Sequence, residues 1–230
     1  MRALLTLIAI TLLPFAQIQA QKSSNRLLFN YGIKAGFQAV TYNNPTFAID
    51  GYRFNENNIE SNEIGYTVNA FFRLTKQKFY LQTEAAFGIT KHTFEFIEEG
   101  TSPITAINAP EYHLTTYCIQ VPILLGYNFI NYDNYRMGVF TGPRTKFILA
   151  TRCKQEFSNF TYEDLREMMP RKTYYWELGL DIRIYNIFFD ITYDYEFIDY
   201  KSTIISQQSG KEFHSQRNDN VLSFTVGFIF

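Results

Sequence analysis

The chain has 230 residues, a net charge of -1 and an aromatic content of 18%. Without a basic stripe or an RNA-binding motif, the sequence gives no reason to expect nucleic-acid binding. After the N-terminal region it contains no apolar run of the ~20 residues that a membrane-spanning helix needs, which excludes a helical membrane protein.

The N-terminal 20 residues have the pattern of a secretory signal peptide. Arg2 supplies a positive charge, residues 3–15 are an apolar run, and Ala20 is a small residue at a cleavage position. We predict cleavage between Ala20 and Gln21, which leaves residues 21–230 as a single domain. The apolar run is too short for a membrane anchor, and Gln21 is not the cysteine of a lipoprotein.

Eight segments of the chain alternate between apolar and polar residues, as strands with one apolar face do. They are Leu28–Thr41, Glu63–Thr75, Phe79–Phe96, Tyr112–Ile130, Asn134–Thr151, Tyr174–Tyr185, Ile187–Tyr200 and Asn220–Phe230.

The connections between these segments alternate in length. Short turns at 76–78, 131–133 and 186 alternate with long connections at 42–62, 97–111, 152–173 and 201–219. Outer-membrane barrels have short periplasmic turns and longer outer loops. The predicted fold class is therefore all-β, an eight-stranded antiparallel up-and-down transmembrane β-barrel. In the third long loop, Glu163–Met169 before Pro170 predicts a short helical turn.

The apolar faces are too bulky to lie inside such a barrel. Most carry four to six large side chains, whereas an eight-stranded barrel of the lipocalin type encloses packed side chains or one small ligand. Turned outward, the same faces form a lipid-contacting band. The predicted aromatic girdles are Tyr127, Phe129, Tyr132, Tyr135 and Tyr185 near the short turns, and Tyr174, Trp176 and Phe197 near the long loops.

The opposite faces carry charged residues, which must then point into the lumen. In a narrow interior these charges are tolerated only when paired, so we predict a structural charge network that closes the lumen. A small pore or gated path is the alternative. The predicted network comprises Lys34, Arg73, Glu84, Arg144, Glu177, Asp181, Arg183, Asp190 and Asp194, with Arg136, Lys146 and Glu196 also facing inward.

The turn at 131–133 suggests a register for the two strands beside it. Pairing Ile130 with Asn134 sets Gln120 opposite Arg144 and Pro122 opposite Gly142. The two prolines, Pro122 and Pro143, predict a local bulge because each lacks a donor for the ladder.

The same register bears on the two cysteines. Cys118 lies opposite Lys146, seven residues short of Cys153, so a disulfide requires the loop to fold back. The register makes the bridge the less favoured alternative without excluding it.

Residues for chemistry are sparse. His92, His113 and His214 fall at outer strand ends or in loops without metal-ligand spacing, and we predict that they are solvated. His214 and Ser215 are neighbours whose side chains point apart, so they do not form an acyl-transfer pair. We therefore expect no cofactor, no metal and no enzymatic activity.

The last ten residues combine an apolar face with an aromatic end. Leu222, Phe224, Val226, Phe228 and Phe230 alternate with small or polar residues. This pattern predicts the closing strand, with Phe230 as the C-terminal signal for membrane insertion. The expected partners are outer-membrane lipid, the barrel-assembly machinery during insertion and envelope proteins that meet the long loops.

Several short motifs occur in an order that resembles a known family. They are Gly32–Phe37, Tyr80–Glu84, Ile119–Leu125, Gly142-Pro143 and Val226–Phe228. In this order the chain resembles the PorT-like outer-membrane β-barrel family of Gram-negative bacteria over nearly all of the mature sequence. The resemblance implies a barrel in the cell outer membrane and kinship with a type IX secretion component. It supplies no catalytic residues, and no signature here singles out secretion.

Three functions remain open from the sequence. The first is a structural or interaction protein with a closed lumen. The second is an accessory component of an envelope secretion or transport machine, and the third is an outer-membrane lipid-modifying enzyme.

Overall fold

The computed structural model describes residues 26–46, 48–49, 52–54, 64–98, 111–132, 134–156, 165–168, 170–198, 200–206 and 210–230. The predicted signal peptide, residues 1–20, lies outside these ranges. Every regular element within them is a β-strand. Over the same ranges there is no helix with the length and hydropathy needed to cross a membrane.

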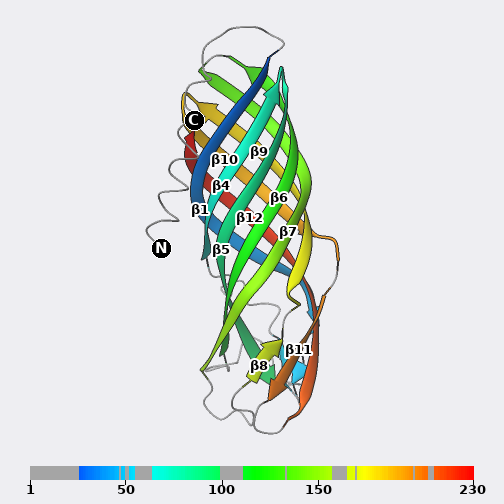
Figure 1. Cartoon of the computed structure of the whole chain (residues 1–230). Coiled ribbons are helices and arrows are strands. Elements are labelled where there is room, and N and C mark those ends of the chain that lie inside the picture. The colour runs from blue at the N-terminus through cyan, green and yellow to red at the C-terminus, as the bar shows by residue number, and fades with distance from the viewer. Residues whose placement is uncertain are drawn as a thin grey trace, which may run out of the picture.

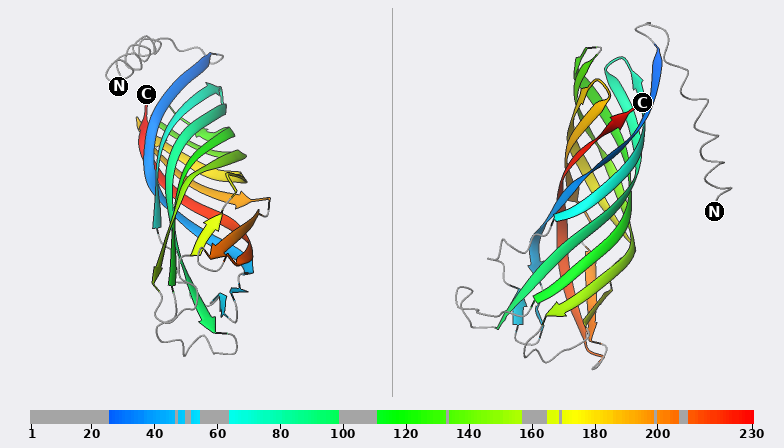
Figure 2. Two further views of the ribbon diagram at one scale, coloured as in Figure 1. Left: turned by 60° about the horizontal axis from the view of Figure 1, so that its bottom comes forward. Right: turned by 90° about the vertical axis from the view of Figure 1, so that its left-hand side faces the viewer.

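Eight antiparallel strands close into a barrel, which confirms the predicted fold class (Figures 1 and 2). Each strand pairs with the next along the barrel, and β1 pairs with β12 to complete the ring. The strands are β1 (Leu27–Thr46), β4 (Ile64–Lys76), β5 (Phe79–Glu98), β6 (Glu111–Asn131), β7 (Tyr135–Glu156), β9 (Lys172–Ile184), β10 (Ile187–Glu196) and β12 (Glu212–Ile229).

Four short strands extend the sheets at the long-loop end: β2 (Ala48–Ile49), β3 (Tyr52–Phe54), β8 (Leu165–Met168) and β11 (Tyr200–Ser206). In Figure 1, β8 and β11 lie beyond the barrel, at the end opposite the C-terminus. β11 pairs with β12 on one side and β8 on the other, while β3 pairs with β5.

Two predictions about this end are wrong. Leu165–Met168, inside the predicted helical turn, is a strand, and the predicted loop 201–219 contains most of β11 and the first part of β12. In both cases a neighbouring strand satisfies the backbone donors and acceptors. Such pairing overrides the weak local signal for a helical turn or an open loop.

At the opposite end two hairpins close with two-residue turns. Lys76 pairs with Phe79 and Ile184 pairs with Ile187. The first turn residue has a positive φ in both, 57° at Gln77 and 54° at Tyr185. Such tight turns match the twist of the flanking strands and explain why this end carries little chain outside the barrel.

The apolar faces point outward, as predicted. On β4 the outward positions alternate strictly with buried ones, and Ile64 and Val68 are 57% and 60% exposed. The predicted girdle residues Tyr132, Tyr185, Trp176 and Phe197 are exposed as well. The large apolar side chains on this surface therefore form the band that contacts lipid.

The predicted register between β6 and β7 is wrong by two residues. Gln120 pairs with Lys146 and Pro122 with Arg144, because the hairpin is wider than the sequence suggested and contains a bulge between Asn128 and Ile130. A shift of two leaves every side chain on its predicted face. The ladder keeps its register from Pro122 to Leu125, so the bulge predicted at the prolines is also wrong.

The two cysteines are not bonded to one another. Cys118 is buried and lies opposite Ile148, whereas Cys153 is half-buried and lies opposite Leu114. The less favoured disulfide is therefore absent from the structure.

Aromatic rings inside the barrel pack over glycines on the neighbouring strand. Tyr80 lies opposite Gly126, and a Cβ at Gly126 would lie 2.0 Å from the Tyr80 Cζ. Phe140 lies opposite Gly179, where a Cβ would lie 2.2 Å from the ring. Each ring takes the space that a side chain would otherwise fill, a pairing in which an aromatic residue covers a strand glycine.

We expect Gly126→Val to lower the free energy of unfolding by about 1–3 kcal/mol, because the new side chain must displace the Tyr80 ring. Denaturant unfolding in lipid vesicles measures the change. Ala70→Val, on the lipid-facing surface, is the control and should alter stability by less than about 0.5 kcal/mol. Equal effects of the two substitutions would contradict the ring-over-glycine interpretation.

Candidate functional site: the charged lumen

Lys34 on β1 links strands across the lumen. Its Nζ lies 2.7 Å from Glu84 on β5 and 2.5 Å from Asp190 on β10. Glu84 also accepts hydrogen bonds from Gln82 at 2.6 Å and Asn69 at 2.8 Å. The three charged side chains are at most 1% exposed, so these contacts replace water almost completely.

Arg73 on β4 forms a second centre nearer the short turns. Its Nη1 donates to Asp181 at 3.0 Å and its Nε donates to Gln82 at 2.5 Å. The Tyr80 hydroxyl donates to the other Asp181 oxygen. The guanidinium also stacks 4.0 Å from the Tyr80 ring centroid and 4.7 Å from that of Phe188, so its planar faces are covered.

Arg144 on β7 forms the third centre. Its Nε donates to Glu177 on β9 at 2.8 Å. Its Nη1 donates to Gln120 and to Asp194 on β10, both at 2.8 Å. Since these partners lie on three different strands, Arg144 ties together one side of the barrel wall.

The structure places eight of the nine predicted network residues in these three centres: Lys34, Arg73, Glu84, Arg144, Glu177, Asp181, Asp190 and Asp194. Arg183 is apart from them. It is half-buried at the short-turn end of β9, where its Nε donates to the Tyr185 carbonyl oxygen at 2.7 Å. Strand alternation predicts the face on which Arg183 lies but not its distance from the acidic residues.

Two further buried carboxylates lie toward the long-loop end. Glu196 and Asp219 are buried there, and the Asp219 backbone N donates to a Glu196 oxygen at 2.7 Å. Lys146, also buried, lies with its Nζ 5.6 Å from the Tyr175 ring centroid. Among the described residues, no three His, Cys, Asp or Glu side chains are grouped so as to hold a metal ion.

Most of the aromatic residues that share the lumen with these charges were not predicted from the sequence. Phe71 and Phe188 pack 5.2 Å apart near Ile229, Tyr80 packs with Leu124 and Phe140, and Tyr175 packs with Val40 and Val221. Strand parity could have found Phe71, which alternates with Asn69 and Arg73 on the buried face of β4.

The histidine prediction is wrong for His92, which lies on β5 and is only 3% exposed. β5 continues beyond the membrane band, so an inward residue near its outer end stays enclosed. His113 on β6 is half-buried, and its Nδ1 lies 2.7 Å from the Thr93 hydroxyl. The side chain of His214 lies outside the described residues.

The C-terminal strand joins the first strand at the short-turn end. The Phe230 backbone N donates to the Tyr31 carbonyl oxygen at 2.7 Å, and the Tyr31 N donates back at 3.2 Å. The Phe230 ring is half-exposed and stacks on Tyr31 with centroids 5.6 Å apart. Its role as an insertion signal remains a prediction.

A closed barrel with an apolar outer wall and a charged, buried interior defines the class of outer-membrane β-barrel proteins. Residues 15–202 match the family model described as "Outer membrane protein beta-barrel domain", and the chain belongs to this family of outer membrane proteins. A search of curated proteins finds no significant match.

Several solved structures of outer membrane proteins are similar to this chain, and OprG shares its fold. The outer membrane protein OprG from Pseudomonas aeruginosa is 12% identical, with a TM-score of 0.56, and the alignment covers 91% of this chain and 99% of OprG. AlkL in lipid bilayers is 10% identical, with a TM-score of 0.47 and coverage of 93% and 96%. Ail of Yersinia pestis, in complex with a heparin analogue, is 12% identical, with a TM-score of 0.40 and coverage of 88% and 99%.

We expect Lys34→Met to cost about 3–5 kcal/mol of folding free energy, because it leaves Glu84 and Asp190 buried without their cation. Adding Glu84→Gln and Asp190→Asn to the same variant should restore most of that loss. Denaturant unfolding in vesicles compares the single and the triple variant with Lys76→Met. This control lies at the exposed end of β4, beside the turn. A Lys34→Met variant as stable as the Lys76→Met control would contradict the structural importance of this centre.

Proposed function

We propose that this outer membrane protein is a membrane-embedded scaffold with a closed lumen, which presents an extended strand surface outside the bilayer. The closed lumen is supported by the three ionic centres. Their charged side chains are at most 5% exposed and connect strands on different sides of the barrel. Together with the rings of Phe71, Tyr80 and Phe140, they fill an interior that eight strands leave narrow.

The proposed strand surface outside the bilayer is supported by the length of the strands. A membrane-spanning β-strand needs about 9–11 residues. β5, β6 and β7 have 20, 21 and 22 residues, and because their other ends form the short-turn side, most of the surplus extends at the long-loop end. There the sheets continue into β3, β8 and β11, which gives a hydrogen-bonded surface suited to contacts with other molecules.

We further propose that the mature chain begins at Gln21 and that the protein acts without catalysis, as the sequence suggests. A PorT-like accessory role in an envelope secretion or transport machine is the alternative, and it rests on the resemblance of the short motifs alone. A lipid-modifying enzyme is the third alternative, and the test below distinguishes it from the other two.

Reconstituted in planar bilayers, the protein should give no steady ion-selective openings, because the ionic centres and rings occupy the lumen. A porin inserted into the same membrane serves as the control for bilayer quality. Heat-modifiable migration on gels verifies that the reconstituted barrel is folded. Reproducible openings from the folded protein would contradict the closed lumen.

Purification in gentle detergent should separate the functional alternatives. If the protein is a scaffold, we expect the barrel to purify without a fixed set of envelope partners. A stoichiometric set of partners would favour the accessory role. Lipid A with an altered mass after deletion of the gene would favour the enzyme. Intact mass of the purified protein tests the mature terminus, which should be Gln21.

A further inference from the structure

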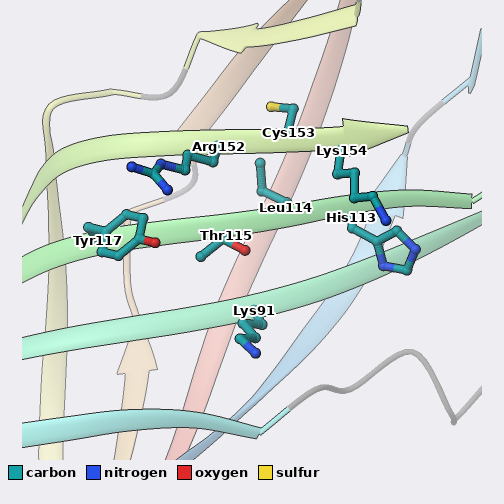
Figure 3. A pocket seen from close by; sticks show the side chains of 8 residues that line it. All are labelled: Lys91, His113, Leu114, Thr115, Tyr117, Arg152, Cys153 and Lys154. Atoms are coloured by element: carbon teal, nitrogen blue, oxygen red, sulfur yellow. The ribbon is translucent and has the colours of Figure 1, made fainter. Parts of the chain in front are cut away.

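A pocket of about 510 Å³ lies on the outer wall of the barrel near the long-loop end (Figure 3). Three neighbouring strands line it. Its polar side chains are Lys91 from β5, His113, Thr115 and Tyr117 from β6, and Arg152 and Lys154 from β7.

Strand alternation places these side chains on the outside. Leu114, Thr116 and Cys118 are at most 2% exposed in the lumen, so the residues between them face outward. Lys91 pairs with Thr115, which pairs with Arg152. Since neighbouring strands lie about 4.8 Å apart, the backbones at Lys91 and Arg152 are about 10 Å apart.

The level of this pocket relative to the membrane follows from the length of the apolar band. The outward run of β5 from Phe79 to Ile89 rises about 33 Å along the strand, or about 25 Å along the barrel axis at a tilt of about 40°. This equals the apolar band of outer-membrane barrels, about 25 Å tall. Lys91 is the next outward residue, so it lies at the level of the lipid headgroups on the long-loop side.

The neighbouring strands place cations at the same edge. The Arg152 guanidinium lies 5.5 Å from the Tyr117 ring centroid, and Lys172 on β9 lies 5.6 Å from that of Phe147. Further out along β5, β6 and β7, the backbone of Glu111 pairs with Glu95 on one side and with Glu156 on the other. These cations therefore lie at the outer edge of the apolar band.

We propose that this pocket binds the phosphate groups of a phosphorylated glycolipid headgroup in the outer leaflet. The long-loop end of such a barrel faces outward, so the lipid at this height belongs to that leaflet. Arginine and lysine are the side chains that recognise phosphate, and a pocket of this volume suits a ligand larger than a free anion. The binding does not depend on whether the lumen conducts.

The test uses the full-length barrel purified in mild detergent and stripped of lipid. Its binding to purified lipid A is compared between the wild type, Lys91→Gln/Arg152→Gln and Lys76→Gln/Lys78→Gln. The second pair removes the same charge from the short-turn end, where both lysines are exposed. We expect the first pair to weaken lipid A binding by about three- to tenfold, the effect of losing two exposed ion pairs, and the control pair to leave it unchanged.

Two further probes identify the group that is bound. Dephosphorylated lipid A should bind the wild-type barrel as weakly as lipid A binds the Lys91→Gln/Arg152→Gln variant, and inorganic phosphate alone should not compete at equal concentration. Equal binding of both lipid forms, equal losses in the two variant pairs, or full competition by inorganic phosphate would each overturn the proposal. Heat-modifiable migration verifies that each variant is folded.

Discussion

Backbone hydrogen bonding in an apolar solvent is the constraint on which this structure depends. An unpaired amide or carbonyl in the bilayer costs several kcal/mol, so a sheet can cross only if it has no open edge. The pairing of β1 with β12, completed by the two bonds between Tyr31 and Phe230, removes that edge. Once the ring closes, each strand must turn one face to lipid and the other to a narrow interior.

That narrow interior explains the chemistry of the lumen. Charged side chains that cannot face lipid must find partners within a few ångströms, and Lys34, Arg73 and Arg144 each meet at least one carboxylate. The remaining space is taken by rings such as Tyr80 and Phe140, which pack where glycine on the next strand leaves room. Charge pairing and ring packing thus solve the same problem of filling a small barrel.

Beyond the bilayer the constraint relaxes and the strands serve a different purpose. β6 and β7 pair continuously as far as Glu111 and Glu156, apart from a register shift next to Cys118. Along their outward faces, apolar residues give way to cations such as Arg152 and Lys154. This change follows the surroundings of the wall, from lipid tails to lipid headgroups.

The sequence by itself determined the number of barrel strands, the orientation of their faces and the charged side chains that enter the lumen, because alternation and loop length depend only on local order. It could not determine the partners of those side chains. Arg183 shares a face with Asp181 yet bonds to a neighbouring carbonyl oxygen, and the β6–β7 register moved by two residues without changing any face. The strands β8 and β11, the ring-over-glycine pairs and the outer cationic pocket each join residues from different segments. Only tertiary structure decides such contacts, because they depend on register and on the closure of the sheet.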